Sequence, residues 1–357
     1  MRDMKLKDKF FLMNSLFMAS VFKKKTPLIV SWAITTRCNK SCVYCDIRNI
    51  KVKELETGQV LSIIAELSQL GTKIIHFTGG EPLLREDIGT IIDYCSEKRI
   101  VTSINTNGSL MEQRIRELKN LNFVGLSLDG PEEVHDYIRG KGSHREVIAA
   151  LALAKNKGIN ARIHTVLSKL NLQNIDFLLE KAEEFDAPIL FQPSTALLLG
   201  GNQQNPLSPE EKEYKQVIEY LIAKKRKTGY IGHSISGLKF LYNWPHLKKI
   251  PCQARLISAR IESDGSIDIC FRNQFKSNPR KSDDVNFRRG FHNLPALYCD
   301  QCCCPSSVEL NCMLSLNPDA VFNTWNLSRK LFKNGGSVSH SLPWCGIRFG
   351  PSIEVDQ

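Results

Sequence analysis

Residues 28–45 read LIVSWAITTRCNKSCVYC, an apolar segment that leads directly into three closely spaced cysteines. Its first half, Leu28–Ile34, is short and apolar, which predicts a buried strand. Cys38, Cys42 and Cys45 then form the pattern C-x3-C-x2-C in the turn after that strand. Three thiolates at this spacing can bind three corners of a cubane iron–sulfur cluster and leave one iron without a protein ligand.

Two other interpretations of the cysteine triad stay open at this stage. A structural zinc site needs four ligands, but the next His or Cys along the chain is His76. The three thiols could also be buried or loop residues without a metal. Twelve cysteines in a reducing compartment nevertheless favour metal ligation over disulfides.

Six short apolar segments alternate with charged, 3.6-periodic stretches between about residues 28 and 235. This order predicts six β-α units and a parallel sheet, with strands covered on both faces. The spacing alone does not distinguish a partial barrel from an open sheet. The predicted strands are Leu28–Ile34, Lys73–Phe77, Ile100–Asn105, Phe123–Leu128, Ala161–Leu167 and Pro188–Gln192.

Four motifs at successive strand ends resemble those of the radical S-adenosylmethionine (SAM) superfamily. Its members carry C-x3-C-x-aromatic-C after the first strand, and Tyr44 is the aromatic residue here. Thr78-Gly79-Gly80-Glu81-Pro82 follows the second strand and is similar to the glycine-rich motif that contacts the methionine amino group of SAM. The third and fourth strands end in Thr106-Asn107-Gly108 and Ser127-Leu128-Asp129-Gly130.

The resemblance implies a partial (β/α)6 TIM-like barrel that holds a [4Fe-4S] cluster on Cys38, Cys42 and Cys45. It also implies that one electron cleaves SAM to a 5′-deoxyadenosyl radical, which removes hydrogen from an unactivated C–H bond. Ligands of parallel sheets lie beyond the carboxyl ends of the strands, where all four motifs fall. The predicted SAM-binding residues are Tyr44, Gly79, Gly80, Glu81, Pro82, Ser127 and Arg139.

Side-chain chemistry supports two of these assignments, and four other strand-end residues are candidates for the same site. Glu81 offers a carboxylate to an ammonium group, and the Arg139 fork suits a carboxylate. Asp129, Asn107, His164 and Gln192 also lie at strand ends, where core or capping roles explain them equally well.

A second cysteine-rich region begins after a helix predicted over Ser208–Lys227, with Ser208 as N-cap and Pro209 at the first helical position. Cys252, Gly265 and Cys270 form C-x12-G-x4-C across a predicted hairpin (Arg255–Ile261 and Ser266–Phe271) with an Asp264-Gly265 turn. The pattern resembles the opening of the SPASM/Twitch extension of radical SAM enzymes, a small α+β cysteine-rich module. That resemblance implies an auxiliary [4Fe-4S] cluster that assists oxidation or maturation of the substrate.

The ligands of the auxiliary cluster are not unique in this sequence. A Twitch-like module would use Cys252, Cys270, Cys299 and Cys302 for one cluster, which we favour. A SPASM-like module would add a second cluster from Cys303 or Cys304, Cys312 and Cys345. A closed zinc site and a merely structural module are the alternatives. Cys95 lies on a helical pattern and is predicted to be a buried apolar residue.

The 48 Lys and Arg against 37 Asp and Glu give a net charge of +11 over 357 residues. This charge favours an anionic partner, so the competing function is a zinc-bound, basic nucleic-acid-binding module without catalysis. No base-reading helix or RNA-stacking motif is recognisable. For the radical SAM function we expect an electron donor such as flavodoxin or ferredoxin, and a peptide, lipid-like or small-molecule substrate.

The amino-terminal 26 residues combine seven basic and two acidic side chains, a local net charge of +5, with enough apolar residues for an amphipathic helix. This helix could lie on an anionic membrane surface, cover the end of the barrel or dock a partner. No apolar run reaches the ~18 residues that span a bilayer, and no signal peptide is recognisable. We therefore expect a cytoplasmic protein, peripheral to the membrane at most.

The predicted organisation has four segments: a basic amino-terminal segment (1–27), the barrel (28–235), the auxiliary-cluster module (236–325) and a tail (326–357).

Overall fold

The computed structural model describes residues 6–198, 203–247, 250–268, 270, 287–294, 298–299 and 302–324. Six parallel strands follow one another across one sheet in chain order. Each predicted strand is present, and its ends lie within two residues of the predicted ones. The strands are β1 (Ile29–Thr35), β2 (Ile74–Gly79), β3 (Val101–Thr106), β4 (Phe123–Ser127), β5 (Asn160–Leu167) and β6 (Ile189–Pro193).

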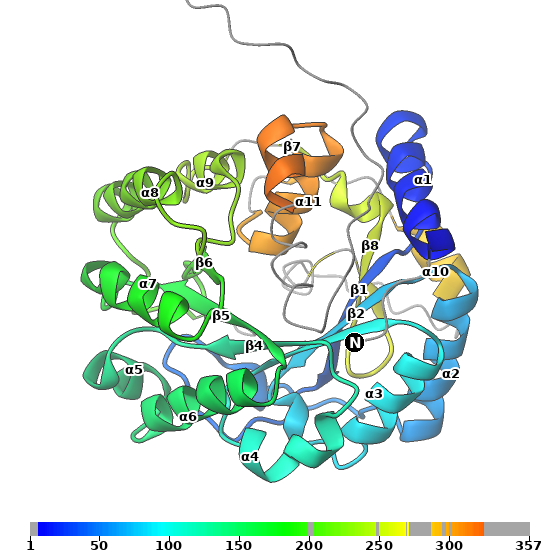
Figure 1. The fold of residues 1–357 in the computed structure, drawn as a ribbon, viewed down its shortest axis with the longest axis horizontal. Helices are drawn as coiled ribbons and strands as arrows, with labels where there is room; N and C mark the ends of the chain where they lie inside the picture. The colour runs from blue at the N-terminus through cyan, green and yellow to red at the C-terminus, as the bar shows by residue number, and fades with distance from the viewer. Residues whose placement is uncertain are drawn as a thin grey trace, which may run out of the picture.

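The helices between the strands cover the outer face of the sheet and follow its curve (Figure 1). This arrangement confirms the α/β fold class and the partial barrel. In chain order the helices are α2 (Thr57–Gln69), α3 (Ile88–Glu97), α4 (Met111–Arg114), α5 (Glu132–Arg139), α6 (Ser143–Asn156), α7 (Ile175–Glu184) and α8 (Glu211–Lys225).

The strands are unequal on their two faces. Residues of β3 and β5 alternate strictly between buried and partly buried positions. β3 and β5 therefore depart from the expected cover on both faces, because only their outer faces pack against helices, whereas four of the five residues of β4 are buried. Ser103, Asn105, Arg162 and His164 are among the polar residues at the partly buried, inner positions.

The main core lies between the sheet and the outer helices. Trp32, Phe77 and Phe191 of the strands are fully buried there, together with Ile64 and Leu67 of α2. Burial of each such side chain stabilises the fold by about 1.5–3 kcal/mol. This layer holds the strand ends, and the motifs that follow them, in fixed positions.

The predicted hairpin is present and adds to the barrel sheet. β8 (Ser258–Ile261) pairs in parallel with β1, and β9 (Ile267–Asp268) pairs antiparallel with β8. Gly265 occupies the turn with φ +86°. The first strand is shorter than predicted because Ala254–Leu256 forms a 3-10 helix. Phe271, the predicted end of the second strand, lies outside the described residues.

The other described residues of the carboxyl-terminal part are mainly helical. α11 (Pro305–Leu314) packs against α9 (Ile235–Leu241) beside the barrel. The remaining elements are α10 (Phe287–Asn293) and the short strands β7 (Ile250–Pro251) and β10 (Tyr298–Cys299), which pair with each other. Whether 236–325 is a separate unit stays a prediction.

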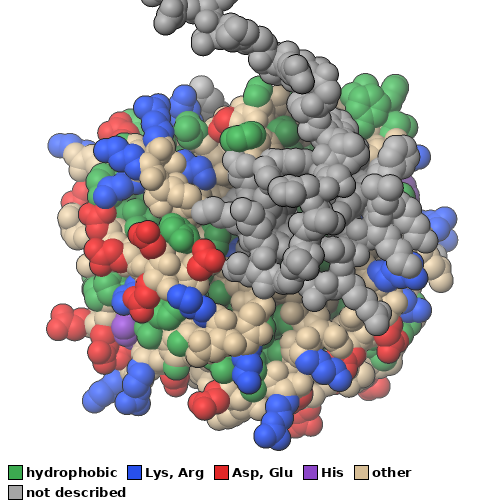
Figure 2. All heavy atoms as spheres, viewed as in Figure 1, with side chains coloured by type: hydrophobic (Ala, Val, Ile, Leu, Met, Phe, Trp, Pro, Cys, Tyr) green, Lys and Arg blue, Asp and Glu red, His purple; other side chains and the backbone are tan. Residues whose placement is uncertain are grey.

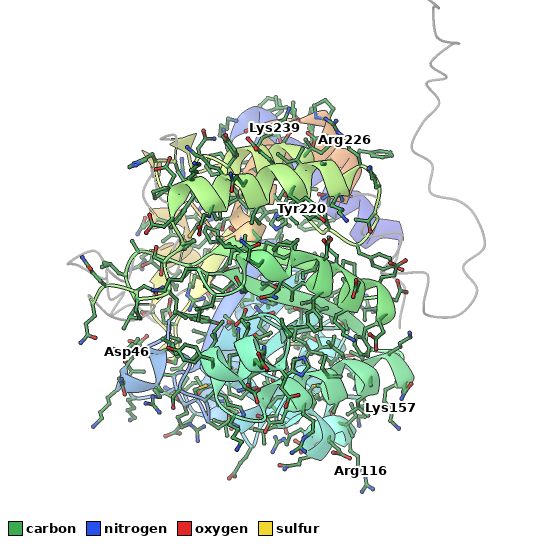
Figure 3. All side chains as sticks on the ribbon, turned by 90° about the vertical axis from the view of Figure 1, so that its left-hand side faces the viewer. Asp46, Arg116, Lys157, Tyr220, Arg226 and Lys239 are labelled. Atoms are coloured by element: carbon green, nitrogen blue, oxygen red, sulfur yellow. The ribbon has the colours of Figure 1, made fainter. Side chains whose placement is uncertain are left out.

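The start of α8 differs from the sequence-based expectation. Its N-cap is Glu210 and not Ser208, and Glu210 makes no side-chain capping bond. The Ser208 backbone N–H instead donates to the Asn205 carbonyl, which keeps Ser208 and Pro209 in the approach to the helix. Viewed from the side, α8 lies next to α7, and its Tyr220 hydroxyl donates to Asp176 (Figure 3).

The amino-terminal helix α1 (Leu6–Phe22) has a buried and an exposed side. Ala19 is fully buried in a cluster that includes Leu256 and Leu314, whereas Phe17 and Phe22 are 57% and 64% exposed. The described part of the chain contains no helix with the length and hydropathy of a membrane span. Lys/Arg and Asp/Glu side chains are interspersed on the outer helices of the face in Figure 2.

Candidate functional site

The loop after β1 brings the three amino-terminal cysteines together at the carboxyl edge of the sheet. Cys38, Cys42 and Cys45 are all partly buried. Burial raises the pKa of the Cys45 thiol to about 11, and the charges of Cys42 and Cys38 add to the effect. Burial also raises the pKa of Cys38, again with a contribution from Cys42. These electrostatic interactions indicate that the three sulfur atoms lie close to one another.

Tyr44 anchors this loop to the barrel. Its side chain is 8% exposed, and its hydroxyl donates to Asp129 Oδ2 at 2.9 Å. The Val43 backbone N–H donates to the Ile138 carbonyl of α5 at 2.9 Å, and the Cys45 N–H closes a turn onto Cys42. The aromatic position of the motif therefore fixes where the neighbouring cysteines lie.

Asp129 is the centre of a buried polar network after β4. Arg139 Nε donates to Asp129 Oδ2 at 2.6 Å, and the Val166 N–H donates to Oδ1 at 3.0 Å. Arg139 also stacks on Tyr44 and lies 4.0 Å from Cys42 Sγ. Burial alone would lower the pKa of Arg139, but Asp129, Tyr44 and Cys42 outweigh it and hold that pKa well above its ordinary value.

This network changes the interpretation of two predicted residues. Asp129 orients both Tyr44 and Arg139, a role that its position at a strand end did not reveal. Arg139 directs its Nε to Asp129 and one end of its fork to Cys42. Its predicted contact with the SAM carboxylate or ribose stays a prediction.

Gly79 and Gly80 let the end of β2 touch the start of the cysteine loop. A Cβ atom on Gly79 would lie 2.1 Å from the Thr35 carbonyl oxygen, and one on Gly80 would lie 2.1 Å from that of Arg37. Gly79 also has φ +122°. The Gly80 and Glu81 N–H groups donate to these same two carbonyls at 2.8 Å each. No other residue type fits this approach without moving the backbone.

Glu81 is fully buried and connects the ends of β2 and β3 through hydrogen bonds. Its carboxylate accepts from the Leu83 N–H at 3.1 Å, and from Thr106 Oγ1 and the Asn107 N–H at 2.8 Å each. Burial raises its pKa, and the three hydrogen bonds oppose that rise. The geometry thus gives Glu81 a role in joining β2 to β3, while its predicted contact with an ammonium group stays a prediction. Pro82 starts the 3-10 helix that follows.

The other strand-end residues lie around the same edge. Asn107 donates to Asn39 of the cysteine loop at 2.9 Å, which links the end of β3 to that loop. Ser127, His164 and Gln192 are partly buried on their strands. Burial lowers the pKa of His164 to about 3, and the nearby His76 and Arg162 lower it as well.

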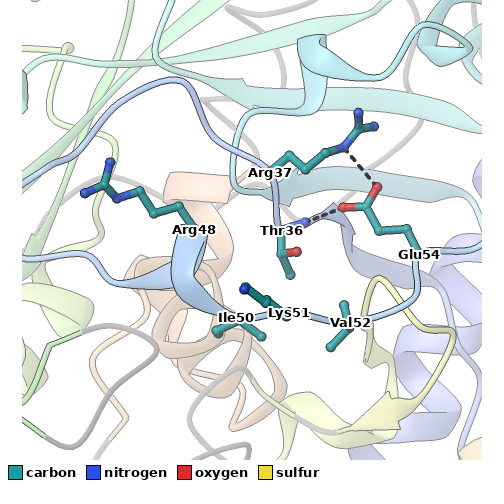
Figure 4. Close-up of a pocket in the computed structure, with 7 residues that line it drawn as sticks. All are labelled: Thr36, Arg37, Arg48, Ile50, Lys51, Val52 and Glu54. Carbon is teal, nitrogen blue, oxygen red and sulfur yellow. Dashed lines mark hydrogen bonds and ion pairs between the residues drawn. The ribbon is translucent and has the colours of Figure 1, made fainter.

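Sequence reasoning missed Glu54, which supports the loop from the other side. Its carboxylate accepts from Thr35 Oγ1 at 2.5 Å. It also accepts from the Thr36 N–H at 2.9 Å and pairs with Arg37 Nε at 3.3 Å (Figure 4). A cavity of about 370 Å³ lies here. The residues that line this cavity are Thr36, Arg37, Arg48, Ile50, Lys51, Val52 and Glu54. No spacing pattern in the sequence predicts the role of Glu54.

In the carboxyl-terminal part, the backbone brings two predicted ligand segments together. The pairing of β7 with β10 sets Cys299 opposite Ile250, two residues from Cys252. Asn311 of α11 donates to Cys302 Sγ at 3.9 Å and accepts from the Ala254 N–H at 2.9 Å. The segments around Cys252, Cys299 and Cys302 therefore meet.

Neighbouring cysteines have different surroundings. Cys303 is buried in the main core near Tyr214, whereas Cys302 and Cys312 belong to a second apolar cluster. The prediction for Cys95 is confirmed, since it is fully buried in the main core. Cys345 lies outside the described residues, and the ligand assignments of the auxiliary cluster stay predictions.

The described residues contain no group of three or more His, Cys, Asp or Glu side chains that could hold a single metal ion. Thiolates that bind three different irons of a cubane stand farther apart than the ligands of one zinc ion. The loop with Cys38, Cys42 and Cys45, and the glycines that let β2 approach it, fit a cluster with an adjoining ligand. The donor set is therefore consistent with a [4Fe-4S] cluster.

Comparison with known proteins gives one family match. Residues 32–182 match the family model described as the radical SAM superfamily. The Fe-coproporphyrin III synthase of Methanosarcina barkeri is 33% identical over 214 residues, covering 57% of this chain and 53% of that protein. The mycofactocin maturase MftC of Mycolicibacterium smegmatis is 29% identical over 221 residues, covering 59% and 56%. The chain spans about half the length of these curated relatives.

Solved structures resemble the fold at low identity. Streptococcus suis SuiB bound to S-adenosylmethionine superposes with a TM-score of 0.60 at 15% identity, over 87% of this chain and 71% of SuiB. SuiB bound to its precursor peptide SuiA gives 0.58 at 16% identity, over 78% and 70%. These likenesses support the barrel fold.

Proposed function

The chain belongs to the radical SAM superfamily of enzymes, which use a [4Fe-4S] cluster and SAM, and from this membership we propose that it generates a radical to remove hydrogen from an unactivated C–H bond. In such enzymes the reduced cluster and SAM together supply a 5′-deoxyadenosyl radical. The observation that carries the proposal is the contact between the cysteine loop and the glycines at the end of β2.

The chain's own residues would build the site in two parts. Cys38, Cys42 and Cys45 would hold the cluster, and the Tyr44–Asp129 hydrogen bond would fix their loop against the barrel. The backbone of Gly79 and Gly80 would border SAM, and Ser127 and Arg139 would contact its carboxylate or ribose. The barrel interior would receive the substrate and exclude water from the radical.

An auxiliary cluster in the carboxyl-terminal part would assist oxidation or maturation of the substrate. Its proposed ligands are Cys252, Cys270, Cys299 and Cys302. Support comes from the pairing of β7 with β10, which joins the segments around Cys252 and Cys299, and from Asn311, which joins those around Cys252 and Cys302.

We further propose that an acidic electron carrier, such as a flavodoxin or ferredoxin, docks beside the cysteine loop. Arg37, Arg48 and Lys51 are exposed there and line the cavity in Figure 4. Positive charge close to the cluster loop would speed encounter with an acidic protein. Charge reversal at Arg48 and Lys51 should slow reduction by flavodoxin but not by dithionite.

For the substrate, a peptide is the first candidate. SuiB is a structural neighbour that has been solved with a precursor peptide, and one relative is named as a maturase. A small molecule is the second candidate, because another relative is named as an Fe-coproporphyrin III synthase. Fractionation of a cell extract by molecular size would distinguish the two candidates. The size fraction that contains the substrate should stimulate deoxyadenosine formation by the reconstituted chain.

The direct test of the function is SAM cleavage by anaerobically reconstituted protein with dithionite. The wild-type chain should produce 5′-deoxyadenosine and methionine. Replacement of Cys38, Cys42 and Cys45 together by Ala should abolish the product, whereas Cys95→Ala, a buried thiol in α3, should retain it. Undiminished cleavage by the triple variant would refute the ligand assignment.

A further inference from the structure

Arg162 carries an unbalanced charge inside the barrel. It lies on the inner face of β5, opposite Gly125 of β4, and is partly accessible from the interior. Its guanidinium stacks on an aromatic side chain, with its Cζ 5.3 Å from the centre of the Phe123 ring. No carboxylate of the described chain pairs with it.

Ring stacking offsets only part of the cost of this partial burial. A cation over an aromatic ring gains about 0.5–2 kcal/mol, whereas a buried charge without an ionic partner costs several kcal/mol. Burial lowers the pKa of Arg162, and no acidic group opposes that effect. The structure therefore maintains a cation at a cost that a bound anion would offset.

The surroundings of Arg162 are polar but uncharged. Burial lowers the pKa of His76 to about 4 and that of His164 to about 3, so both rings are neutral at pH 7. Arg260, the other arginine near His76, already forms an ion pair with Glu262 at 2.5 Å. The charge of Arg162 thus has no ionic partner among the described residues of the inner barrel face.

Two polar side chains next to Arg162 have hydrogen-bonding atoms without a partner among the described residues. A Cβ atom on Gly125 would lie 2.1 Å from Asn105 Oδ1 and 2.8 Å from His164 Nε2, so both polar side chains reach over this glycine. Asn105 Oδ1 is buried without a hydrogen-bond partner among the described residues. The His164 ring makes no hydrogen bond within that part of the chain either.

We propose that Arg162 binds a carboxylate group of the substrate inside the barrel and that a ring N–H of His164 donates to the same group. Asn105 Oδ1, which is an acceptor, would take an N–H or O–H of the substrate beside that carboxylate. The planar guanidinium fork matches a carboxylate, and a single unpaired charge balances a monoanion better than a phosphate dianion. The proposal rests on the proposed function, since it assigns the barrel interior to the substrate. Ligands without an anionic group would then bind poorly.

The test measures binding of simple probes to the reconstituted full-length chain by calorimetry. Glutarate is the carboxylate probe, glutaramide its neutral counterpart of the same shape, and inorganic phosphate the competing anion. The wild-type chain should bind glutarate at least about tenfold more tightly than glutaramide. Equal affinities, or tighter binding of phosphate than of glutarate, would overturn the proposal.

Variants locate the effect. Arg162→Gln should lose the preference for glutarate, and Arg162→Lys should keep part of it, because it retains the charge without the fork. Arg116→Gln makes the same charge change at an exposed position on the outside of the barrel (Figure 3) and should bind like the wild type. A preference that survives Arg162→Gln contradicts the proposal. Deoxyadenosine formation by the wild type tests the proposed function separately, since glutarate binding does not depend on it.

Discussion

At the scale of single residues, the site depends on buried polar groups that hold one another in place. Asp129 has no exposed surface and joins Tyr44, Arg139 and the β5 backbone, and Glu81 likewise joins β2 to β3. Neither role could be predicted from the sequence. A strand-end carboxylate is visible in a motif, but its partners come from segments that only the folded chain brings together.

Asp129→Asn should destabilise the domain by about 3–5 kcal/mol, because it leaves the Arg139 charge buried without its counter-ion. We expect a lower urea midpoint and less iron per chain after reconstitution. Asp93→Asn is the control, since Asp93 forms a surface pair with Lys119 at 3.6 Å and should change stability by less than about 1 kcal/mol. Equal stability of the two variants would show that the network is not structural.

His135 should make the domain sensitive to acid. Burial lowers its pKa from 6.5 to about 3. Above pH 6.5 the ring is neutral in both states. As the pH falls below 6.5 the unfolded chain binds a proton that the folded chain does not, so stability decreases by up to about 1.4 kcal/mol per pH unit until the folded pKa is reached.

The measurement is urea unfolding at pH 7, 6 and 5. His135→Asn removes the titrating ring, and its amide oxygen can still accept from the Asp129 N–H, as His135 Nδ1 does at 3.1 Å. The variant should lose less stability on acidification. An unchanged pH dependence would mean that His135 does not carry this linkage.

At the scale of elements, the strands and the cysteine loop were predictable because they depend on local patterns. A short apolar segment and the spacing of Cys38, Cys42 and Cys45 can both be read along the chain. The pairing of β8 with β1 was not predictable, since Ser258–Ile261 joins a strand more than 200 residues earlier in the sequence. The polar inner face of β5 was also missed, because its alternation lies within a segment read as simply apolar.

The contact between β2 and the cysteine loop should be sensitive to a single methyl group. Gly80→Ala places its Cβ 2.1 Å from the Arg37 carbonyl oxygen, so the loop must shift at a cost of about 1–3 kcal/mol. We expect less bound iron and weaker SAM binding, measured by iron analysis and calorimetry. Gly58→Ala is the matched control, because its Cβ in α2 meets no atom within 4 Å. Normal SAM binding by the Gly80 variant would contradict the importance of this contact.

At the scale of the whole molecule, α1 illustrates where a sequence pattern stops being informative. Residues 1–26 predicted an amphipathic helix with three alternative roles. The structure supports the covering role through Ala19, and Phe17 and Phe22 leave an exposed apolar side that keeps the membrane contact as a prediction. Helix periodicity does not show which neighbours cover each side.

A double variant, Phe17→Ser with Phe22→Ser, should weaken retention on anionic liposomes without changing stability by more than about 0.5 kcal/mol. Sedimentation with phosphatidylserine vesicles measures the retention. Tyr137→Ser, at an exposed aromatic residue of α5, controls for the loss of surface hydrophobicity. If the wild-type chain does not sediment with the vesicles, α1 serves only to cover the barrel.

The central claim is that the sulfurs of Cys38, Cys42 and Cys45 hold a cluster whose open iron accepts SAM. Electron paramagnetic resonance of the anaerobically reduced chain, recorded with and without SAM, tests it most directly. We predict that the cluster signal changes when SAM is added, and that the change is absent when these three cysteines are replaced by Ala. A reduced-cluster spectrum that SAM leaves unaltered would contradict the account.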